Sequence, residues 1–211
     1  MTAYPELPEH AFTKADPAPD LDFYAQPRLV HHIDDTAVAA VTALYRTLLP
    51  AGGVVLDTMS SWVSHLPPDV DYAEVIGQGM NADELAANPR LDRWFVQDLN
   101  RKPDLPLPDA SADAACQCVG VQYLQRPAEV FAGLRRVLRA GAPLVVTFSN
   151  RCFPTKAVAI WQALRPADQQ RLVALYLSRA GFVDVTATTL VSGARSDPLW
   201  AVHGRAAALA T

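Results

Sequence analysis

An acidic residue and two serines follow the first strongly apolar run of this chain. Residues 54–57 read Val-Val-Leu-Asp, and Thr58, Met59, Ser60 and Ser61 come directly after Asp57. Open α/β sheets bind ligands outside the carboxyl ends of their strands. The serine hydroxyls can hydrogen-bond a ligand or cap a following helix, whose N-terminus favours an anion. This stretch therefore predicts a ligand-binding loop, and the alternative is a packed turn with Trp62 in the core.

Two residues that can hold a substrate follow later predicted strands. Arg151 comes after the strand expected at 142–149, and its guanidinium can bind a carboxylate or phosphate through two hydrogen bonds. It can equally be a loop residue that pairs with an acid of its own chain. Tyr123 comes after the strand expected at 113–121. It can orient a substrate or simply form the wall of a pocket.

A polar cluster, Pro-Arg-Leu-Val-His-His-Ile-Asp at 27–34, precedes the first long predicted helix. Tyr24, Arg28, His31 or His32 can face a substrate from this segment. A histidine titrates near neutral pH and can act as a general base. The alternative is that one of the adjacent histidines is exposed and the other is packed. His65 and His203 are interpreted as structural.

Composition limits the class of protein. The chain has 211 residues, of which 50% are hydrophobic, and a net charge of -4. These values suit one domain with a sizeable core and give no general attraction to nucleic acid or to an anionic membrane. No apolar stretch approaches the roughly 20 residues of a membrane span. The N-terminus lacks the basic start and apolar core of a secretory signal, so a cytoplasmic protein is expected.

The cysteines do not predict a disulfide framework or a metal site. Cys116 and Cys118 lie two apart on a predicted strand, so they face the same side of it and remain reduced in a cytoplasm. Zinc usually needs four ligands, and no histidine or second cysteine pair lies nearby. We expect the cysteines, with Cys152, to be small buried apolar residues and the chain to hold no metal.

The elements that position these residues alternate between strand and helix. A helix capped by Asp34 or Asp35 ends before Pro50, a helical turn is expected at 60–66, and Asn81 caps a further helix. Prolines open three later helices at 127–138, 154–164 and 166–180. Strands are expected at 54–57, 72–77, 93–99, 113–121 and 142–149, followed by a hairpin at 182–192 and 198–207. This order predicts a three-layer αβα sandwich with a mostly parallel sheet and an antiparallel C-terminal edge hairpin.

Residues 1–22 contain four prolines and few aliphatic residues, so they predict an extended arm. Residues 23–211 are expected to form a single domain, in which 23–50 make an N-terminal cap helix region. The arm either closes over the ligand site as a lid or straps the body of the protein.

The order of these features resembles the class I S-adenosylmethionine (SAM)-dependent methyltransferases, in particular the small-molecule branch called type 11. The resemblance covers about residues 36–206 and implies a Rossmann-like, seven-stranded sheet. Four stretches carry it: VVLD, VIGQGMNADEL, VQDLNRKPDLPLPDASADAA and EVFAGLRRVLRAGAPLVVTFSN. The strings LDTMSSWVSHLP and GMNADELAANPRLD are similar to those of a divergent branch of the same fold.

The resemblance implies a cofactor site built from several strand ends. Asp57 matches the acid near the methionine part of SAM, and the backbone from Thr58 through Met59 and Ser60 to Ser61 matches the loop around that part. Asp98 and Leu99 match the pair whose carboxylate and backbone meet the adenine. The remaining matched positions, at the ends of the second and fourth strands, are Gly79, Met80, Asn81, Val119 and Gly120.

Two departures from the family pattern concern this cofactor site. The family loop reads Asp/Glu-x-Gly-x-Gly, because glycine lets the backbone approach the ligand, whereas this chain has Met59 and Ser61 at the glycine positions. The family usually ends the second strand with an acid for the ribose hydroxyls, and this chain has Gly79 there, followed by Met80 and Asn81. Loss of a charged acceptor weakens binding by roughly ten- to a hundredfold.

These observations predict SAM-dependent methyl transfer to a small-molecule acceptor. The alternative is a non-catalytic protein of the same fold that binds a partner or another ligand. An NAD-dependent reductase is disfavoured, because no Gly-x-Gly-x-x-Gly follows residues 54–57.

Overall fold

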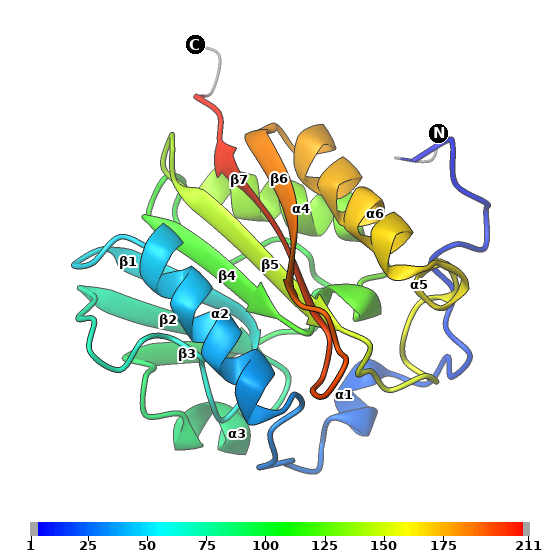
Figure 1. The fold of residues 1–211 in the computed structure, drawn as a ribbon, viewed down its shortest axis with the longest axis horizontal. Helices are drawn as coiled ribbons and strands as arrows, with labels where there is room; N and C mark the ends of the chain where they lie inside the picture. Colours follow the sequence, from blue (N-terminus) through cyan, green and yellow to red (C-terminus); the bar gives the residue numbers. More distant parts are fainter. Residues whose placement is uncertain (1–3, 209–211) are drawn as a thin grey trace.

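A seven-stranded sheet forms the centre of the structure, a computed structural model that describes residues 4–208 (Figure 1). The strands are β1 (Val54–Ser60), β2 (Glu74–Gly79), β3 (Arg93–Val96), β4 (Ala114–Cys118), β5 (Pro143–Ser149), β6 (Phe182–Val191) and β7 (Leu199–Ala206). Their order in the sheet is β3-β2-β1-β4-β5-β7-β6. The first five strands pair in parallel, and β7 runs antiparallel to both β5 and β6. The predicted mostly parallel sheet with its antiparallel edge hairpin is confirmed.

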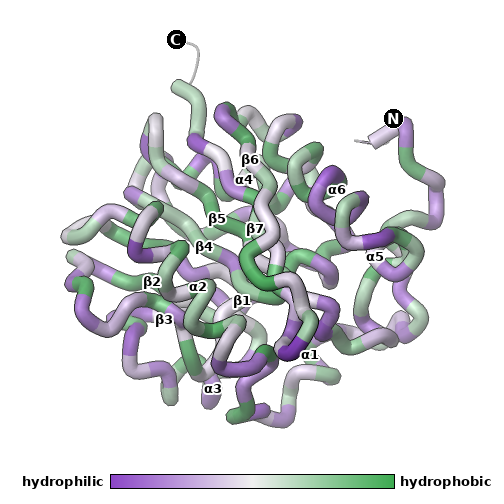
Figure 2. The backbone as a smooth tube through the Cα atoms, in the orientation of Figure 1, coloured by the Kyte–Doolittle hydropathy of each residue, from purple (hydrophilic) through white to green (hydrophobic). Residues whose placement is uncertain are grey.

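Helices cover both faces of the sheet, which confirms the three layers (Figure 1). The helix α2 (Asp35–Leu48) packs on one face, and α4 (Pro127–Val137) and α6 (Pro166–Arg179) pack on the other. The short helices are α1 (Asp20–Phe23), α3 (Ala82–Ala87), α5 (Ala159–Ala163) and the 3-10 helix η1 (Val121–Tyr123). In Figure 2 hydrophobic residues run along β5, whose residues are all buried. No helix within residues 4–208 combines the length and apolarity that a membrane crossing needs.

Local signals explain where the long helices begin. The Asp34 carboxylate caps α2 by accepting a hydrogen bond from the Ala37 N–H at 2.9 Å, as the sequence predicts. The face of α2 that carries Val41 and Tyr45 is buried against the sheet. Pro127 and Pro166 stand in the first turns of α4 and α6, where a missing backbone N–H has no cost.

The helical turn expected at 60–66 is wrong. Strand β1 continues to Ser60, and the chain from Ser61 to Pro67 contains no helix. The hydroxyls of Ser60 and Ser64 donate hydrogen bonds back to Asp57, and Pro67 is followed by a second proline. Side-chain bonds of this kind compete with helix formation, and proline removes a backbone donor.

The fifth helix is also shorter than expected. It begins at Ala159 rather than at Pro154. The N-terminal segment explains the difference, because the Ala159 N–H donates to the Thr13 carbonyl at 2.8 Å and the Ile160 N–H donates to the Ala11 carbonyl at 2.9 Å. These backbone groups are therefore used between segments rather than within a helix.

The N-terminal segment packs against the body of the protein along α5 and α6 (Figure 1). Tyr4 and Ala11 are buried, and the Tyr4 ring lies 5.2 Å from the Tyr176 ring. Lys156, whose side chain is 0% exposed, donates to the Ala18 carbonyl at 2.7 Å and pairs with Asp16 at 3.0 Å. We propose that residues 4–22 act as a strap that contributes to the core; residues 1–3 of the predicted arm lie outside the described residues.

Deleting residues 1–22 should lower the melting temperature of the ligand-free protein, because buried aromatic surface and the partners of a buried lysine are removed together. Differential scanning calorimetry measures this. An unchanged melting temperature combined with weaker ligand binding would instead indicate a lid.

A point variant tests the same strap without shortening the chain. Lys156→Met should lower the melting temperature, because it removes the ionic partner of Asp16 and the donor to the Ala18 carbonyl. Lys102→Met is the matched control, since Lys102 is exposed. Equal melting temperatures for the two variants would contradict the strap.

Candidate functional site

A cavity lies at the carboxyl ends of the parallel strands, beside η1 and the segment that contains α1. Strand ends supply Asp57, Gln78, Asp98 and Cys118 to its lining. Segments from the N-terminal part of the chain supply Tyr24, Arg28 and His32, and the loop after β5 supplies Phe153. Convergent polar groups in one hollow of an α/β sheet, at the place where such sheets bind ligands, make this the candidate site.

Asp57 organises the loop after β1. Its carboxylate accepts hydrogen bonds from the hydroxyls of Ser60, at 2.7 Å, and of Ser64, and the Cys116 thiol lies 3.6 Å from its other oxygen. Burial raises the pKa of the Asp57 carboxyl, and the donated hydrogen bonds partly oppose that shift. The two hydroxyls curl residues 60–64 around the carboxylate.

Met59 keeps a backbone conformation that favours glycine. Its φ angle is +52°, and Val119 across the cavity has a φ of +46°. Such left-handed angles are uncommon for residues with a Cβ and cluster at functional sites. A Cβ at Gly120 would lie 2.8 Å from the Met59 Cβ and 2.9 Å from its sulfur. Gly120 therefore provides the space that the Met59 side chain occupies.

The end of β2 has no room for an acidic side chain. A Cβ at Gly79 would come within 2.4 Å of the Ser60 carbonyl oxygen, because β1 extends far enough to pair Ser60 with Gly79. A carboxylate on the helix that follows β2, Glu84 of α3, lines the cavity. It accepts hydrogen bonds from the Ser61 hydroxyl and, at 2.7 Å, from the Arg28 backbone N–H.

Helix α3 holds two other segments in place through asparagines at its ends. The side-chain oxygen of Asn81 caps the helix, and its side-chain NH2 group donates to the backbone carbonyls of Tyr24 and Ala25 at 2.9 and 3.1 Å. The Asn88 amide donates to the Ser61 carbonyl at 2.8 Å and to the Ser64 hydroxyl at 2.9 Å. Helix α3 therefore holds the loop after β1 in place through the Asn88 side chain.

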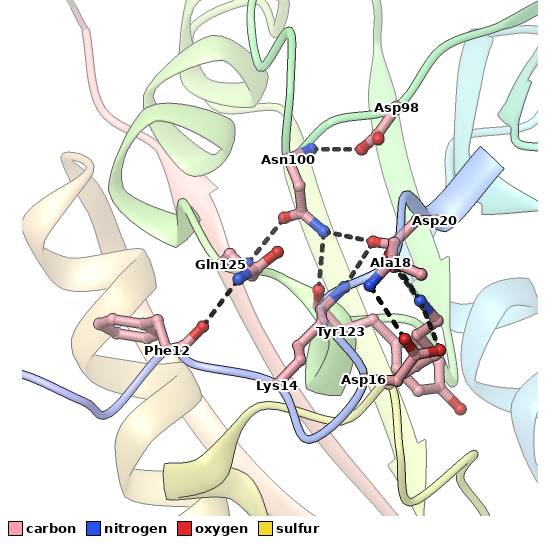
Figure 3. Close-up of polar contacts among 10 residues, drawn as sticks. Phe12, Lys14, Asp16, Ala18, Asp20, Asp98, Asn100, Tyr123 and Gln125 are labelled. Carbon is pink, nitrogen blue, oxygen red and sulfur yellow. Dashed lines mark hydrogen bonds and ion pairs between the residues drawn. The ribbon is translucent and has the colours of Figure 1, made fainter. Parts of the chain in front are cut away.

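Asp98 and Leu99 lie on the opposite side of the cavity. One Asp98 oxygen accepts the Asn100 backbone N–H at 2.9 Å, and its other oxygen has no hydrogen bond to residues 4–208. The Leu99 backbone N–H also has no partner within that range. Figure 3 shows that the side chain of Asn100, next to Leu99, donates a hydrogen bond to Asp20 and accepts one from the Gln125 backbone N–H. A free acceptor beside a free donor matches the hydrogen-bonding edge of an adenine.

His32 and Tyr123 also line the cavity. Burial lowers the pKa of His32, so its imidazole is neutral at neutral pH. The Tyr123 hydroxyl accepts the Phe153 N–H at 2.9 Å, and burial raises its pKa to about 12. His31 lies outside, stacked on Trp62 with ring centres 5.1 Å apart, and Arg151 also lies outside, paired with Asp197 at 2.7 Å.

Most residues predicted from the sequence line the same cavity: Asp57, Met59, Ser60, Ser61, Met80, Asp98, Leu99, Val119 and Gly120. Thr58 points elsewhere, because its hydroxyl donates to the Cys116 carbonyl. Gly79 packs against the backbone of Ser60, and Asn81 caps α3. Trp62 lies outside the buried core.

The sequence analysis missed Glu84, Gln78 and Asn100. Glu84 stands three residues after the Asn81 cap, which is the spacing of a capping box and predicts only a helix start. In the structure its carboxylate bonds Ser61 and Arg28 instead. Gln78, fully buried, accepts the Met59 N–H at 2.9 Å.

The cysteines are free, and two of them belong to this region. Cys116 is buried, and Cys118 lines the cavity with its pKa raised to about 12 by burial. Thiols in this state are protonated and unreactive at neutral pH. Within residues 4–208, no three His, Cys, Asp or Glu side chains are grouped so as to hold a metal ion.

His65 should make stability depend on pH. Burial lowers its pKa from 6.5 to about 4, and the His31 and His32 charges add to the effect. The unfolded chain then binds more protons between pH 4 and 6.5, so the free energy of unfolding falls as pH falls through this window, by up to roughly 3 kcal/mol. The melting temperature of His65→Gln should fall less than that of the parent between pH 7 and pH 5. Parallel curves would contradict this assignment.

Part of this chain matches a known protein family. A methyltransferase domain model matches residues 71–146, from the approach to β2 into β5. The match therefore contains Asp98, Leu99 and Gly120 and begins after the loop that follows Asp57. No curated protein sequence matches the chain significantly.

Solved structures resemble the whole fold at low sequence identity. A chain from the Haloferax volcanii complex between the Trm112 methyltransferase activator and a putative methyltransferase has a TM-score of 0.63 and 13% identity, covering 84% of this chain and 92% of that one. A SAM-dependent methyltransferase from Mesorhizobium loti has a TM-score of 0.56 and 17% identity, covering 79% and 97%.

A third similar structure is phosphoethanolamine N-methyltransferase 2 from Haemonchus contortus, in complex with SAM. Its TM-score is 0.58 at 13% identity, covering 81% of this chain and 52% of that one. The family match and the architecture agree. This chain has the fold of SAM-dependent methyltransferases, and its residues 71–146 match a methyltransferase domain model.

Proposed function

We propose that this chain binds SAM in the cavity and transfers its methyl group to a small-molecule acceptor. The observation that supports this most directly is the corner formed by Asp98 and Leu99, which offers a free carboxylate oxygen beside a free backbone N–H. These two groups complement the amino group and ring nitrogen of adenine. The corner also lies inside the segment that matches a methyltransferase domain.

Glu84 is the residue that we assign to the ribose hydroxyls. The end of β2 is closed to a side chain at Gly79, and Glu84 presents the neighbouring carboxylate of the cavity wall. Its two oxygens each accept one hydrogen bond, from Arg28 and Ser61. A carboxylate has about four lone-pair sites, so acceptor capacity for two hydroxyls remains.

The loop after β1 fits the remaining part of the cofactor. Met59 retains the left-handed backbone of a glycine, and Ser60 and Ser61 line the cavity. SAM supplies a methyl group that its sulfonium charge already activates. The protein mainly has to align the acceptor and exclude water. His32, neutral at neutral pH, can accept a proton from an acceptor that must lose one.

One observation favours a second function. The hydroxyls of Ser60, Ser61 and Ser64 all donate to carboxylates of the protein itself. A loop satisfied in this way needs no ligand to hold it. The chain would then be a non-catalytic protein of this fold that binds a partner or another ligand.

S-adenosylhomocysteine (SAH), the demethylated product of SAM, separates the two functions. A ligand at about a hundred times its dissociation constant stabilises the folded state by about 2.7 kcal/mol. We therefore expect the melting temperature to rise by roughly 5–10 °C with SAH and to stay unchanged with NAD or ATP. Asp98→Ala should abolish the rise. Asp104→Ala, which removes an exposed carboxylate of the same loop, is the control and should retain it.

The absence of any SAH-dependent rise at millimolar ligand would refute cofactor binding. The result would instead support a non-catalytic protein of this fold that binds a partner or another ligand.

Glu84→Gln tests the assignment to the ribose. It keeps the shape of the side chain and removes its charge, so SAH affinity should fall roughly 10- to 100-fold by isothermal titration calorimetry. Adenine, which has no ribose, should bind the variant and the parent equally. Equal loss of affinity for both ligands would show that Glu84 acts only by holding the loop.

A further inference from the structure

Arg28 brings to the cavity a positive charge that no carboxylate of residues 4–208 pairs with. The ion pairs within that range do not include its guanidinium. Its side-chain hydrogen bonds go to the Phe23 carbonyl, at 2.9 Å from Nη2, and to the Gln26 carbonyl, at 3.3 Å from Nη1. Both acceptors are neutral. Since a guanidinium has N–H groups on three nitrogens, further donors remain for a ligand.

Aromatic rings fix the plane of this guanidinium. Its central carbon lies 4.6 Å from the centre of the Phe23 ring, 5.4 Å from that of Phe153 and 5.8 Å from that of Tyr24. Cation–π contacts hold the guanidinium without using its N–H groups. The group is therefore held ready for a planar, bidentate partner such as a carboxylate.

Most charged groups around Arg28 already have partners. Asp20 pairs with Lys14 and also lies 3.5 Å from the Lys156 ammonium. The Glu84 carboxylate accepts hydrogen bonds from two neutral donors, the Ser61 hydroxyl and the Arg28 backbone N–H. Burial and the Arg28 charge lower the pKa of His32 against the opposing Glu84 charge, so that His32 is neutral at neutral pH. An anion entering here meets the unpaired positive charge of Arg28 and has to bind on the side of the guanidinium that faces away from Glu84.

The surrounding wall is apolar and aromatic. The Phe153 ring lies edge-on to Phe23 at 5.2 Å and is stacked on Tyr123 at 6.1 Å. Tyr123 belongs to η1, directly after the end of β4, where Val119 and Gly120 also line the cavity. A ligand held by Arg28 would thus place its body between aromatic rings, beside the end of β4 where Val119 and Gly120 line the cavity.

We propose that the methyl acceptor is a small carboxylic acid with an aromatic or similarly flat apolar body, and that the Arg28 guanidinium binds its carboxylate. This inference rests on the proposed function, because it names the acceptor class for the same cavity. It assigns to Arg28 the anion-binding role that the sequence suggested for Arg151, whose guanidinium is paired with Asp197.

Three probes with the same ring test the charge preference: benzoate, benzyl alcohol and benzyltrimethylammonium. Each is titrated into the full chain with saturating SAH and again without SAH, and binding is followed by calorimetry or by ligand-observed NMR. We expect benzoate to bind more tightly than the neutral and cationic probes. Arg28→Gln should weaken benzoate roughly 10- to 100-fold, since a charge-assisted bidentate contact is lost.

Two further variants control for charge and for general effects. Arg28→Lys should retain part of the benzoate affinity, because it keeps a point charge without the planar fork. Arg171→Gln removes the same charge from an exposed position on α6 and should leave benzoate binding unchanged. The backbone contact between residue 28 and Glu84 persists in every variant at this position.

Three results would overturn the inference. These are preference for benzyltrimethylammonium, no benzoate binding up to its solubility, and equal benzoate affinity in Arg28→Gln and the parent. A fourth concerns the donor: if Arg28→Gln weakens SAH but not 5′-methylthioadenosine, which lacks the amino-acid carboxylate, the guanidinium serves the cofactor and not the acceptor. Failure of SAH to bind the parent would refute the proposed function, whereas the titrations without SAH would still test the carboxylate site.

Discussion

The buried Asp57 carboxylate is the constraint on which the ligand-facing end of this fold depends. A carboxylate without water needs hydrogen-bond donors, and the chain supplies them as the hydroxyls of Ser60 and Ser64. These bonds curl the loop after β1 and replace the helical turn that a sequence of this kind favours. The loop therefore turns back on Asp57 with Met59 in a left-handed conformation, although it contains no glycine.

Changes elsewhere follow from this loop. The extension of β1 to Ser60 presses its carbonyl against the end of β2, so that only glycine fits at position 79. The acidic side chain of this region is then Glu84 on α3, which accepts a hydrogen bond from Ser61. Asn88, which caps the C-terminal end of the same helix, donates hydrogen bonds to Ser61 and Ser64. Gly120 makes room for Met59 on the opposite side. Gly79 and Gly120 therefore occupy positions where the backbone or a neighbouring side chain leaves no room for a Cβ, and the acidic side chain of this region is that of Glu84.

The sequence predicts the sheet and the helix caps, because strand alternation, prolines and capping residues are local signals. Asp57, Asp98 and Gly120 were expected at the site because the resemblance to a methyltransferase family implies them, and all three line the cavity. The helical turn at 60–66 was wrong, since the bonds from Ser60 and Ser64 to a buried acid are tertiary. Glu84 was missed because its spacing from Asn81 already has a local explanation. Choosing Arg28 over Arg151 required knowing which of the two is paired with an acid.

The central claim is that the rebuilt loop still faces a cofactor, and methionine methyl NMR tests it most directly. Met59, in the loop after β1, and Met80, directly after β2, both line the cavity. With 13C-methyl methionine, the signals of Met59 and Met80, assigned through Met59→Leu and Met80→Leu, should both shift and saturate as SAH is added. Unchanged Met59 and Met80 signals at millimolar SAH would show that the loop has closed on itself and that the cavity serves another ligand.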